Sequence, residues 1–273
     1  MKLKNALQLL KRSPYRFTEV RLCGVPLSTV KNTVRKKPDQ DDAWWFYLAK
    51  HHHRIFDIGC NVGYTALLAL ISNPDTYCVL VDPNPAALNV AQLNLIKNRL
   101  GFKSHFYCGF VGDTSNQSLT FYTIGLGAAG SKYASHAQTA AALGAHTEVQ
   151  TITLDDLMRY YATLPDLVKI DVEGAELEVL EGARTLVEES RCKLFVEMHK
   201  IENLGMEASG DRVLDWCART GYRAWYLKTG TALQSGAEIA HRGKCHLLLM
   251  PETEPYPEYL KGVLPNAELP KTL

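Results

Sequence analysis

The sequence has no apolar run that approaches the ~18–20 residues a membrane span requires, so we expect no transmembrane segment. Its first residues, MKLKNALQLLKR, lack the long apolar centre and small-residue cleavage pattern of a secretory signal peptide. The seven cysteines are scattered and form no CxxC pair, so neither a zinc ribbon nor a thioredoxin-like redox motif is indicated. This cysteine usage favours a reducing cytosol, and we expect a cytoplasmic protein.

Net charge is also small. A balance of +1 over 273 residues gives no reason to expect nucleic acid as a partner. Apolar residues make up 46% of the chain and charged residues 22%, values that are typical of a globular protein with a full hydrophobic core. The length accommodates one large domain, or one domain with an appendage.

The charge is unevenly distributed along the chain. Residues 1–39 contain ten Lys and Arg against Glu19 and Asp39, whereas the remainder has an acidic excess. A solvated basic arm explains this distribution. The alternative is that one face of a helix carries Leu3, Ala6, Leu7 and Leu10. Through this face, residues 1–39 would make a peripheral contact with an anionic membrane surface or a carrier.

From residue 51 to about residue 250, apolar strands alternate with amphipathic helices, which predicts an α/β domain with a mostly parallel sheet. We expect a basic extension over 1–50, built of a helix and short strands, and a C-terminal tail over 251–273. The predicted parallel strands are 54–58, 77–81, 105–109, 166–170 and 193–198. The other predicted strands are an edge strand at 118–124 and an antiparallel pair at 222–227 and 244–250.

The helices follow the same alternation. We predict a helix at 63–71, a helix with Asn84 as its N-cap and Pro85 in its first position, and a short helix beginning at DDLMRYYA. The stretch GAELEVLEGARTLVEE predicts one sheet-facing helix. Residues 125–147 are rich in Gly, Ala and Ser, and their length suggests a functional lid or a disordered segment.

Four of the predicted parallel strands end in a carboxylate, and in open α/β sheets ligands bind outside the carboxyl ends of the strands. These residues are Asp57, Asp82, Asp171 and Glu197. His199 follows Glu197 by two residues and lies on the same face of an extended chain. A helix cap would explain any one of the four, but it explains all four together poorly.

The stretch FDIGCNVGY places a turn directly after the first of these strands. A dinucleotide fingerprint, GxGxxG, needs a glycine where this turn has Asn61, between Gly59 and Gly63. Asn accepts the left-handed conformation, but the loop suits a ligand without phosphates. Asp57 can attract a cationic amine and Asp82 can accept hydrogen bonds from both hydroxyls of a ribose. A ligand with an adenosine and a cationic amino-acid end describes S-adenosyl-L-methionine.

The chain also resembles a known family. The segments that match in order and spacing are FDIGCNVGYTALLA, VDPNPAALNVAQLNL, TITLDDL, DLVKIDVEGAELEVLEGA and FVEMH. They resemble the FkbM-type S-adenosylmethionine-dependent methyltransferases over residues 54–199, and KIDVEGAELEVLEGA is the most specific of them. The resemblance implies a Rossmann-like, doubly wound seven-stranded sheet, the class I methyltransferase fold, and O-methylation of small-molecule or glycan hydroxyls.

The resemblance also implies site residues. Asp82 would hold the ribose, Phe110 or Val111 would border the adenine, and Asp171 would face the methionine end. The full cofactor set is Asp57, Gly59, Cys60, Asn61, Gly63, Tyr64, Asp82, Pro83, Asn84, Phe110, Val111 and Asp171. Cys60 stands where the family usually has Ala, and Asp82 where it more often has Glu, which shortens the reach to the ribose.

Methyl transfer to a hydroxyl depends on alignment and benefits from a general base. His199 is the predicted base, because its intrinsic pKa lies near working pH, and Glu197 or Asp171 could orient it or act instead. Glu173 and His199 are the predicted acceptor contacts, although Glu173 could equally cap a helix. Asp171, Glu197 and His199 could alternatively bind Mg²⁺, Mn²⁺ or Fe²⁺, but we predict no metal.

Two other functions compete with this interpretation. A nicotinamide-dependent oxidoreductase could use a similar sheet, but it requires the GxGxxG that this chain lacks. A non-catalytic cofactor-binding module would be favoured by loss of the polar residues after the fifth parallel strand, yet Glu197 and His199 are both present. The acceptor is predicted only as a small molecule, a sugar or a lipid-linked glycan, and no part of the sequence identifies it further.

Overall fold

The computed structural model describes residues 15–39, 41–125, 130–201 and 203–271. Five parallel strands form one side of the main sheet: β3 (Arg54–Ile58), β4 (Tyr77–Asp82), β5 (Ser104–Cys108), β9 (Leu167–Ile170) and β10 (Lys193–His199). Three antiparallel strands complete it: β11 (Tyr222–Tyr226), β12 (Thr231–Ala232) and β13 (Lys244–Pro251).

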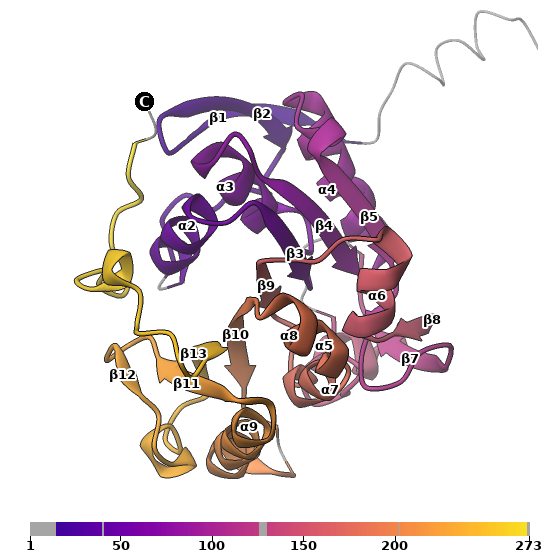
Figure 1. Ribbon diagram of the computed structural model, residues 1–273. Coiled ribbons are helices and arrows are strands. Elements are labelled where there is room, and N and C mark those ends of the chain that lie inside the picture. The colour runs from indigo at the N-terminus through magenta and orange to yellow at the C-terminus, as the bar shows by residue number, and fades with distance from the viewer. Residues whose placement is uncertain (1–14, 40, 126–129, 202, 272–273) are drawn as a thin grey trace, which may run out of the picture.

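The strand order is β12-β11-β13-β10-β9-β3-β4-β5 (Figure 1). The chain builds outward from β3 in one direction and then from β9 in the other, so the predicted doubly wound α/β fold is confirmed. Seven strands make up most of the sheet, and the two-residue β12 adds an eighth at its edge. The crevice between β3 and β9, where the winding reverses, is where such a fold binds its ligands.

Helices cover both faces of the sheet, because successive strand residues point to opposite sides. Ile55 belongs to the core on one face and Phe56 to the core on the other. The helices of the first face are α2 (Asp42–Lys50), α3 (Tyr64–Ser72) and α4 (Pro85–Lys97). Those of the second face are α6 (Leu154–Tyr161), α7 (Glu176–Glu181), α8 (Arg184–Ser190) and α9 (Gly205–Thr220). Short 3₁₀ helices occur at Gly101–Lys103, Gly236–Glu238 and Glu258–Leu260.

The single helix predicted from GAELEVLEGARTLVEE is wrong, because the structure forms two helices, α7 and α8, with a break at Gly182 and Ala183. A Cβ atom on Gly182 would lie 2.2 Å from the carbonyl oxygen of Gly112, so the chain passes against that segment with no room for a side chain. The apolar residues keep their helical spacing through the break, so the sequence pattern does not reveal the break.

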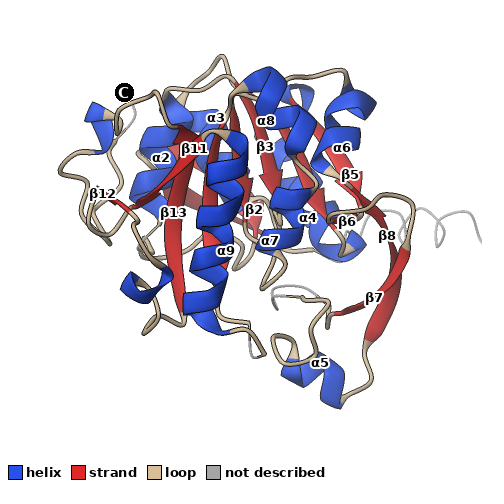
Figure 2. Ribbon diagram, turned by 60° about the horizontal axis from the view of Figure 1, so that its bottom comes forward, coloured by secondary structure: helices blue, strands red, loops and turns tan. Residues whose placement is uncertain are grey.

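A smaller sheet has the order β6-β8-β7 and consists of β6 (Phe110–Val111), β7 (Ser118–Tyr122) and β8 (His146–Ile152). The predicted edge strand at 118–124 is thus an edge strand, but of this second sheet. Figure 2 shows β7 and β8 extending away from the main sheet, with α5 (Gln138–Ala142) beyond them. Of the predicted lid, residues 126–129 lie outside the described part of the chain.

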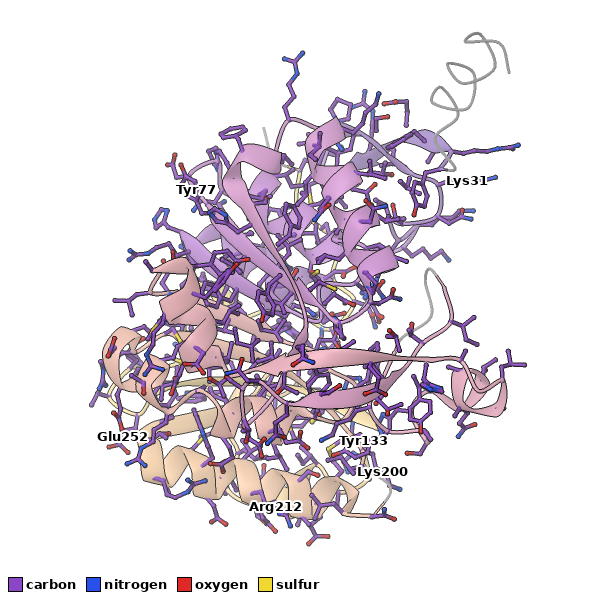
Figure 3. All side chains as sticks on the ribbon, turned by 90° about the vertical axis from the view of Figure 1, so that its right-hand side faces the viewer. Lys31, Tyr77, Tyr133, Lys200, Arg212 and Glu252 are labelled. Atoms are coloured by element: carbon purple, nitrogen blue, oxygen red, sulfur yellow. The ribbon has the colours of Figure 1, made fainter. Side chains whose placement is uncertain are left out.

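The segment between α5 and β7 contacts the ends of the central strands. Ser131 donates a hydrogen bond to the backbone oxygen of Glu173 over 2.9 Å, and the ring of His136 bonds with the backbone oxygen of Lys200 at 3.0 Å. Figure 3 views the molecule from this side, with Tyr133 and Lys200 labelled near each other. Part of the predicted lid is therefore held in place beside the sheet.

The N-terminal part begins with a hairpin of β1 (Phe17–Leu22) and β2 (Val25–Val30). Leu22 and Leu27 of the hairpin, together with Trp44 and Trp45 of α2, are buried in the core of the first face. The division at residues 50 and 250 stays a prediction. The predicted helical face of Leu3 to Leu10 lies outside the described residues.

Among the helices of the described residues, none is long and apolar enough to cross a membrane.

Candidate functional site

The loop after β3 is shaped by three residues with positive φ: Gly59 at 80°, Asn61 at 46° and Gly63 at 80°. A Cβ atom on Gly59 would lie 1.8 Å from the backbone oxygen of Asp171, so only glycine allows the loop to pass between the strand ends. Asn61 adopts the left-handed conformation that the sequence predicted. The loop thereby turns its backbone N–H groups toward the end of β4.

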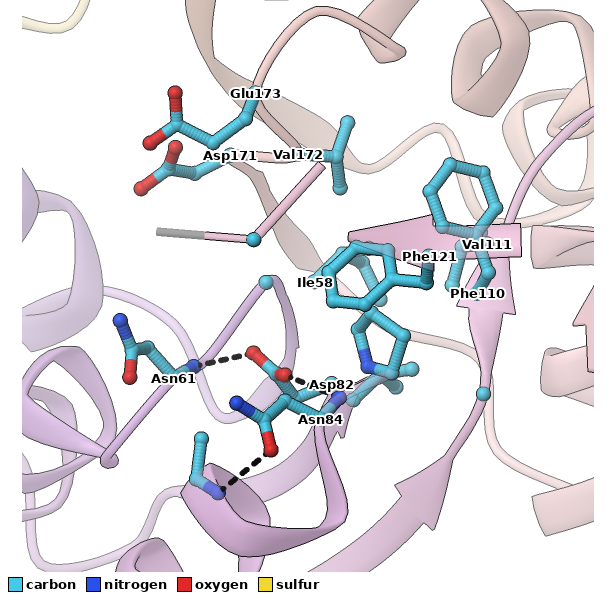
Figure 4. A pocket seen from close by; sticks show the side chains of 16 residues that line it. Ile58, Asn61, Asp82, Asn84, Phe110, Val111, Phe121, Asp171, Val172 and Glu173 are labelled. Carbon is cyan, nitrogen blue, oxygen red and sulfur yellow. Dashed lines mark hydrogen bonds between the residues drawn. The ribbon is translucent and has the colours of Figure 1, made fainter. Parts of the chain in front are cut away.

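Asp82, the last residue of β4, accepts two backbone hydrogen bonds, one of them from this loop. Its Oδ2 accepts from the backbone N–H of Asn61 and its Oδ1 from that of Asn84, each over 2.8 Å (Figure 4). Burial raises the pKa of Asp82 to about 6, although both backbone hydrogen bonds lower it. The carboxylate is held in one orientation and retains capacity for further donors.

A cavity opens beside Asp82 (Figure 4). Nine predicted site residues line it: Gly59, Asn61, Asp82, Pro83, Asn84, Phe110, Val111, Asp171 and Glu173. Seven further residues, which the sequence analysis missed, complete the lining: Ile58, Val81, Ala87, Gly109, Phe121, Gly130 and Val172. Phe121 could have been suspected from the alternating pattern of its strand, and Val172 from its place in the KIDVEG segment.

The cavity has one apolar side and one acidic side. Phe110 and Phe121 pack with ring centroids 6.4 Å apart, and Val111 continues the apolar wall. Asp171 and Glu173 stand together at the other end in Figure 4. This polarity suits a ligand with a flat apolar group at one end and a cationic or hydroxyl-bearing group at the other.

Asp57 does not line this cavity. Its side chain is fully buried, Oδ2 accepts a hydrogen bond from the hydroxyl of Thr65 over 2.6 Å, and Oδ1 lies 3.9 Å from Nζ of Lys169. Burial raises the pKa of Asp57 despite that lysine. The predicted direct attraction of a cationic amine by Asp57 is therefore corrected, since the carboxylate is enclosed beneath the loop.

Cys60 and Tyr64 line a second, adjoining cavity, and Gly63 lies against Ala91 of α4. The hydroxyl of Tyr64 donates a hydrogen bond to Oδ2 of Asp42 over 2.9 Å. The second cavity also takes Gly59, Asn61 and Asp171, which it shares with the first, and it adds Asn32, Thr33, Val34, Arg35, Val62, Thr65 and Lys169. The two cavities meet at the loop after β3.

Lys169, another residue that the sequence analysis missed, is the buried cation of this region. Its Nζ lies 3.0 Å from Oδ2 of Asp171, and its side chain is 2% exposed. Burial favours the neutral amine, but Asp171 and Asp57 outweigh it and raise the pKa of Lys169. A lysine within the apolar strand DLVKI was the available signal, because such a residue is buried only when paired.

His199 lies among carboxylates rather than beside a free acceptor. Its Nδ1 bonds with Oε1 of Glu176 at 2.9 Å, and its Nε2 lies 3.5 Å from oxygens of both Glu173 and Glu197. Burial lowers the pKa of His199, but the hydrogen bonds with Glu176 and Glu197 outweigh it and raise that pKa to about 11. The ring is thus protonated near neutral pH. The prediction of His199 as a general base is wrong, since a protonated imidazole cannot accept a proton.

Glu197 does not line the first cavity. Its Oε1 accepts a hydrogen bond from Nζ of Lys244 over 2.6 Å, and its Oε2 lies 3.2 Å from Nε2 of His246 on β13. Burial would raise the pKa of Glu197, but the contacts with His199 and His246 lower it. Of the four predicted rim carboxylates, only Asp82 and Asp171 line the cavity.

Glu173 is a third titratable group in the lining of the first cavity. Its backbone is left-handed, with φ at 51°, and its side chain lines the cavity beside Asp171. Burial raises the pKa of Glu173, and the neighbouring His199 lowers it. A carboxylate in this position can accept a proton from a bound hydroxyl.

The metal alternative is only partly matched by the geometry. Within the described part of the chain, ligand atoms of Asp171, Glu173 and His199 lie within 4.8 Å of one another. Glu197 instead groups with Asp41 and His246. The predicted trio of Asp171, Glu197 and His199 is therefore not the set that the fold assembles.

A family model described as the methyltransferase FkbM domain matches residues 57–224. A sequence search of curated proteins finds no match.

Three solved structures with similar folds have low sequence identity. Methyltransferase FkbM from Methylobacillus flagellatus KT is 13% identical with a TM-score of 0.47, over 72% of this chain and 43% of its own length. M. jannaschii TYW2 in complex with AdoMet is 10% identical with a TM-score of 0.48, over 87% of this chain and 86% of that one. The O-methyltransferase from Bacillus cereus in complex with SAH is 13% identical with a TM-score of 0.45, over 77% and 79%. This chain thus spans less than half the length of the Methylobacillus protein.

Proposed function

The chain belongs to the FkbM methyltransferase family, and from that premise we propose that it transfers a methyl group from S-adenosyl-L-methionine to a hydroxyl of a small molecule, a sugar or a lipid-linked glycan. The observation that carries the proposal is Asp82, whose two oxygens are oriented by backbone hydrogen bonds at the mouth of a half-apolar cavity. A buried carboxylate whose pKa is raised by burial is under-compensated, so it favours a ligand that donates hydrogen bonds.

The residues present fit this cofactor. Asp82 would accept hydrogen bonds from the ribose hydroxyls, and Phe110, Val111 and Phe121 would enclose the adenine. Asp171, oriented by Lys169, would face the ammonium group, in the region where the second cavity adjoins the first. When bound, S-adenosyl-L-methionine supplies an electrophilic methyl group on its sulfonium.

Glu173 is the proposed general base. It would accept the proton of the acceptor hydroxyl, and its left-handed backbone holds the carboxylate at the cavity wall. His199 would act as a positioning cation, because its protonated ring stands between Glu173 and the buried Glu176. Since Glu197 is enclosed by Lys244 and His246, a direct catalytic role for it has no support in this geometry.

Titration calorimetry with S-adenosylhomocysteine and with NAD separates this proposal from the oxidoreductase alternative. We expect saturable binding of S-adenosylhomocysteine, about tenfold or more weakened in Asp82→Ala, and no binding of NAD. Binding of NAD alone would overturn the proposal. Labelled-methyl transfer to fractionated cell extract would then identify the acceptor.

The role of Glu173 is tested with the Glu173→Gln variant. We expect unchanged affinity for S-adenosylhomocysteine and methyl transfer reduced about 100-fold or more, because the amide cannot accept the proton. Glu188→Gln, an exposed change on α8, is the matched control and should leave turnover unchanged. Full turnover of Glu173→Gln would remove this residue from the mechanism, and loss of turnover in EDTA would favour the metal alternative.

A peripheral contact of residues 1–39 with an anionic membrane or carrier is also proposed. The described part of this segment exposes Arg16, Arg21, Lys31, Lys36 and Lys37. Pelleting with anionic vesicles tests it. The variant for this test lacks residues 1–14 and carries charge reversals at Lys36 and Lys37. If it binds the vesicles as well as the full chain does, the proposed contact is contradicted.

A further inference from the structure

A third cavity, separate from the two at the β3 loop, lies beside β11 in the antiparallel part of the main sheet. This cavity of about 670 Å³ opens between β11 and the C-terminal tail. Its lining consists of Arg223, Trp225, Leu227, Lys228, Thr229, Gly230, Pro255, Tyr256 and residues 260–265. β11 is four strands from β3, which at roughly 4.8 Å per strand puts this cavity about 20 Å from the loop that shapes the proposed methyltransferase site.

The charge of the lining is one-sided. Three residues are basic, Arg223, Lys228 and Lys261, and none is acidic. Lys261 pairs with Glu258 over 2.6 Å, but among the described residues neither Arg223 nor Lys228 forms an ion pair. Residues 40–273 have more acidic than basic side chains. A lining of average composition would therefore include acidic residues, and this one includes none. Two unpaired cations at one cavity favour an anionic ligand.

The floor of the cavity is aromatic and apolar. The rings of Trp225 and Tyr256 lie 5.2 Å apart between centroids, and Leu227 and Leu260 are buried beside them. The guanidinium of Arg223 stands 5.9 Å above the Trp225 ring. The floor can therefore pack against a flat or apolar group while the cations remain at the rim.

One polar atom in this lining lacks a partner. The indole N–H of Trp225 is buried, and no hydrogen-bond acceptor for it occurs in the described part of the chain. A buried donor without an acceptor is costly, and most such groups in folded proteins are satisfied by protein, water or a ligand.

We propose that this cavity binds an organic phosphate, with the phosphate at Arg223 and Lys228 and the organic group against Trp225 and Tyr256. A guanidinium matches the oxygens of a phosphate in two parallel hydrogen bonds, and a lysine adds a point charge. The aromatic floor selects an attached organic group over the free anion. The site is independent of the proposed methyl transfer, since no residue of its lining belongs to either cavity at the β3 loop.

Calorimetric titration of the full chain with phenyl phosphate, inorganic phosphate and phenol tests the proposal. We expect phenyl phosphate to bind at least tenfold more tightly than either of the others, because only it engages both the rim and the floor. If inorganic phosphate binds as tightly as phenyl phosphate, the site holds an adventitious ion only. If phenol binds as tightly as phenyl phosphate, the site is an apolar one. Either result overturns the proposal.

Variants locate the binding. Arg223→Gln with Lys228→Gln should weaken the binding of phenyl phosphate about tenfold or more, and both changes are at exposed positions. Lys103→Gln is the matched control, because Lys103 also stands over an aromatic ring, that of Phe102, outside this cavity. The indole N–H resonance of Trp225, assigned by its loss in Trp225→Phe, should shift on titration. Unchanged affinity in the double variant, or an unshifted indole resonance, overturns the proposal.

Discussion

His199 shows how neighbouring carboxylates decide what one residue can do. The contacts with Glu176, Glu173 and Glu197 hold its ring in the charged form, with the pKa at about 11 instead of the usual 6.5. A histidine with this pKa is an interior cation that neutralises acids. Its removal leaves those carboxylates without their counter-charge, which is costly for buried acids.

The His199→Gln variant should therefore lose stability in a pH-dependent way. The folded pKa is raised, so the stabilisation is fully present below pH 6.5 and is lost as pH rises through about 11. We expect the difference in unfolding free energy between parent and variant to shrink by up to about 3 kcal/mol from pH 6.5 to pH 9. Denaturant unfolding at both pH values measures it, and a difference independent of pH would show that the ring is neutral in the fold.

Asp82 should make cofactor binding pH-dependent in the opposite direction. Its pKa of about 6 means that the carboxylate becomes protonated below this pH and loses acceptor capacity for the ribose. We expect the affinity for S-adenosylhomocysteine to be about tenfold weaker at pH 5 than at pH 8. Calorimetry over this range provides the test. The Asp82→Asn variant should bind weakly at both values, and a parent affinity that does not change with pH would contradict the prediction.

At the scale of elements, the break between α7 and α8 couples a helix junction to the cavity wall. Gly182 lies against Gly112, which directly follows Phe110 and Val111 of the lining. A side chain at position 182 would push the small sheet outward. The break is therefore a packing requirement that also sets the position of the apolar wall.

The Gly182→Ala variant tests this coupling. The added Cβ would lie 2.2 Å from the carbonyl oxygen of Gly112, and overpacking of this kind costs about 1–3 kcal/mol. We expect a lower unfolding free energy and an affinity for S-adenosylhomocysteine reduced at least threefold. Gly243→Ala, where a Cβ atom meets nothing within 4 Å, is the control. If the variant is destabilised but binds S-adenosylhomocysteine with the parental affinity, the helix junction does not set the position of the cavity wall.

For the whole molecule, the N-terminal hairpin and the cofactor loop share one anchor on α4. Asn94 is fully buried, its Oδ1 accepts from the backbone N–H of Val30 over 2.8 Å, and its Nδ2 donates to the backbone oxygen of Val62 over 3.0 Å. Asn98, the residue directly after α4, bonds with both backbone groups of Ser28. The hairpin is thereby tied to the helix that also supports the loop.

Asn94→Ala should disturb both parts at once. The change leaves buried backbone groups of Val30 and Val62 without partners, at a cost of about 3 kcal/mol. We expect the midpoint of thermal unfolding to fall by roughly 5–10 °C, and the affinity for S-adenosylhomocysteine to fall with it. Asn89→Ala, on the same helix with an exposed side-chain contact, should leave both unchanged. A stable variant would mean that the hairpin is held by its apolar contacts alone.

Local chemistry explains which predictions agreed with the structure. The strands agreed because buried parallel strands are short apolar runs, and β3 has the predicted bounds of 54–58. The cap on α4 agreed because Asn84 accepts from the backbone N–H groups of Ala86 and Ala87 and Pro85 follows it, both of which are properties of adjacent residues. The left-handed Asn61 followed from its intrinsic tolerance of that conformation.

The destination of each charged side chain depended on residues far away in the sequence. Glu197 pairs with Lys244 and His246 across an antiparallel strand pair, and Asp57 is enclosed with Lys169 from a neighbouring strand. The alternation of side chains along a strand shows only on which face of the sheet each one lies. It does not show whether a carboxylate is open to a cavity at the end of the strand or enclosed in an ion pair.

The sequence by itself determined the order of strands and helices, the turn after the first parallel strand and the family to which the chain belongs, because these depend on local propensity and on residues close together in the chain. Only the tertiary structure decided that His199 is a buried cation, that Asp82 and Asp171 alone of the four carboxylates reach the cavity, and that Glu173 joins them in its lining. The reason is electrostatic: the charge state and accessibility of a buried group are set by the charges that the fold brings within a few ångströms of it.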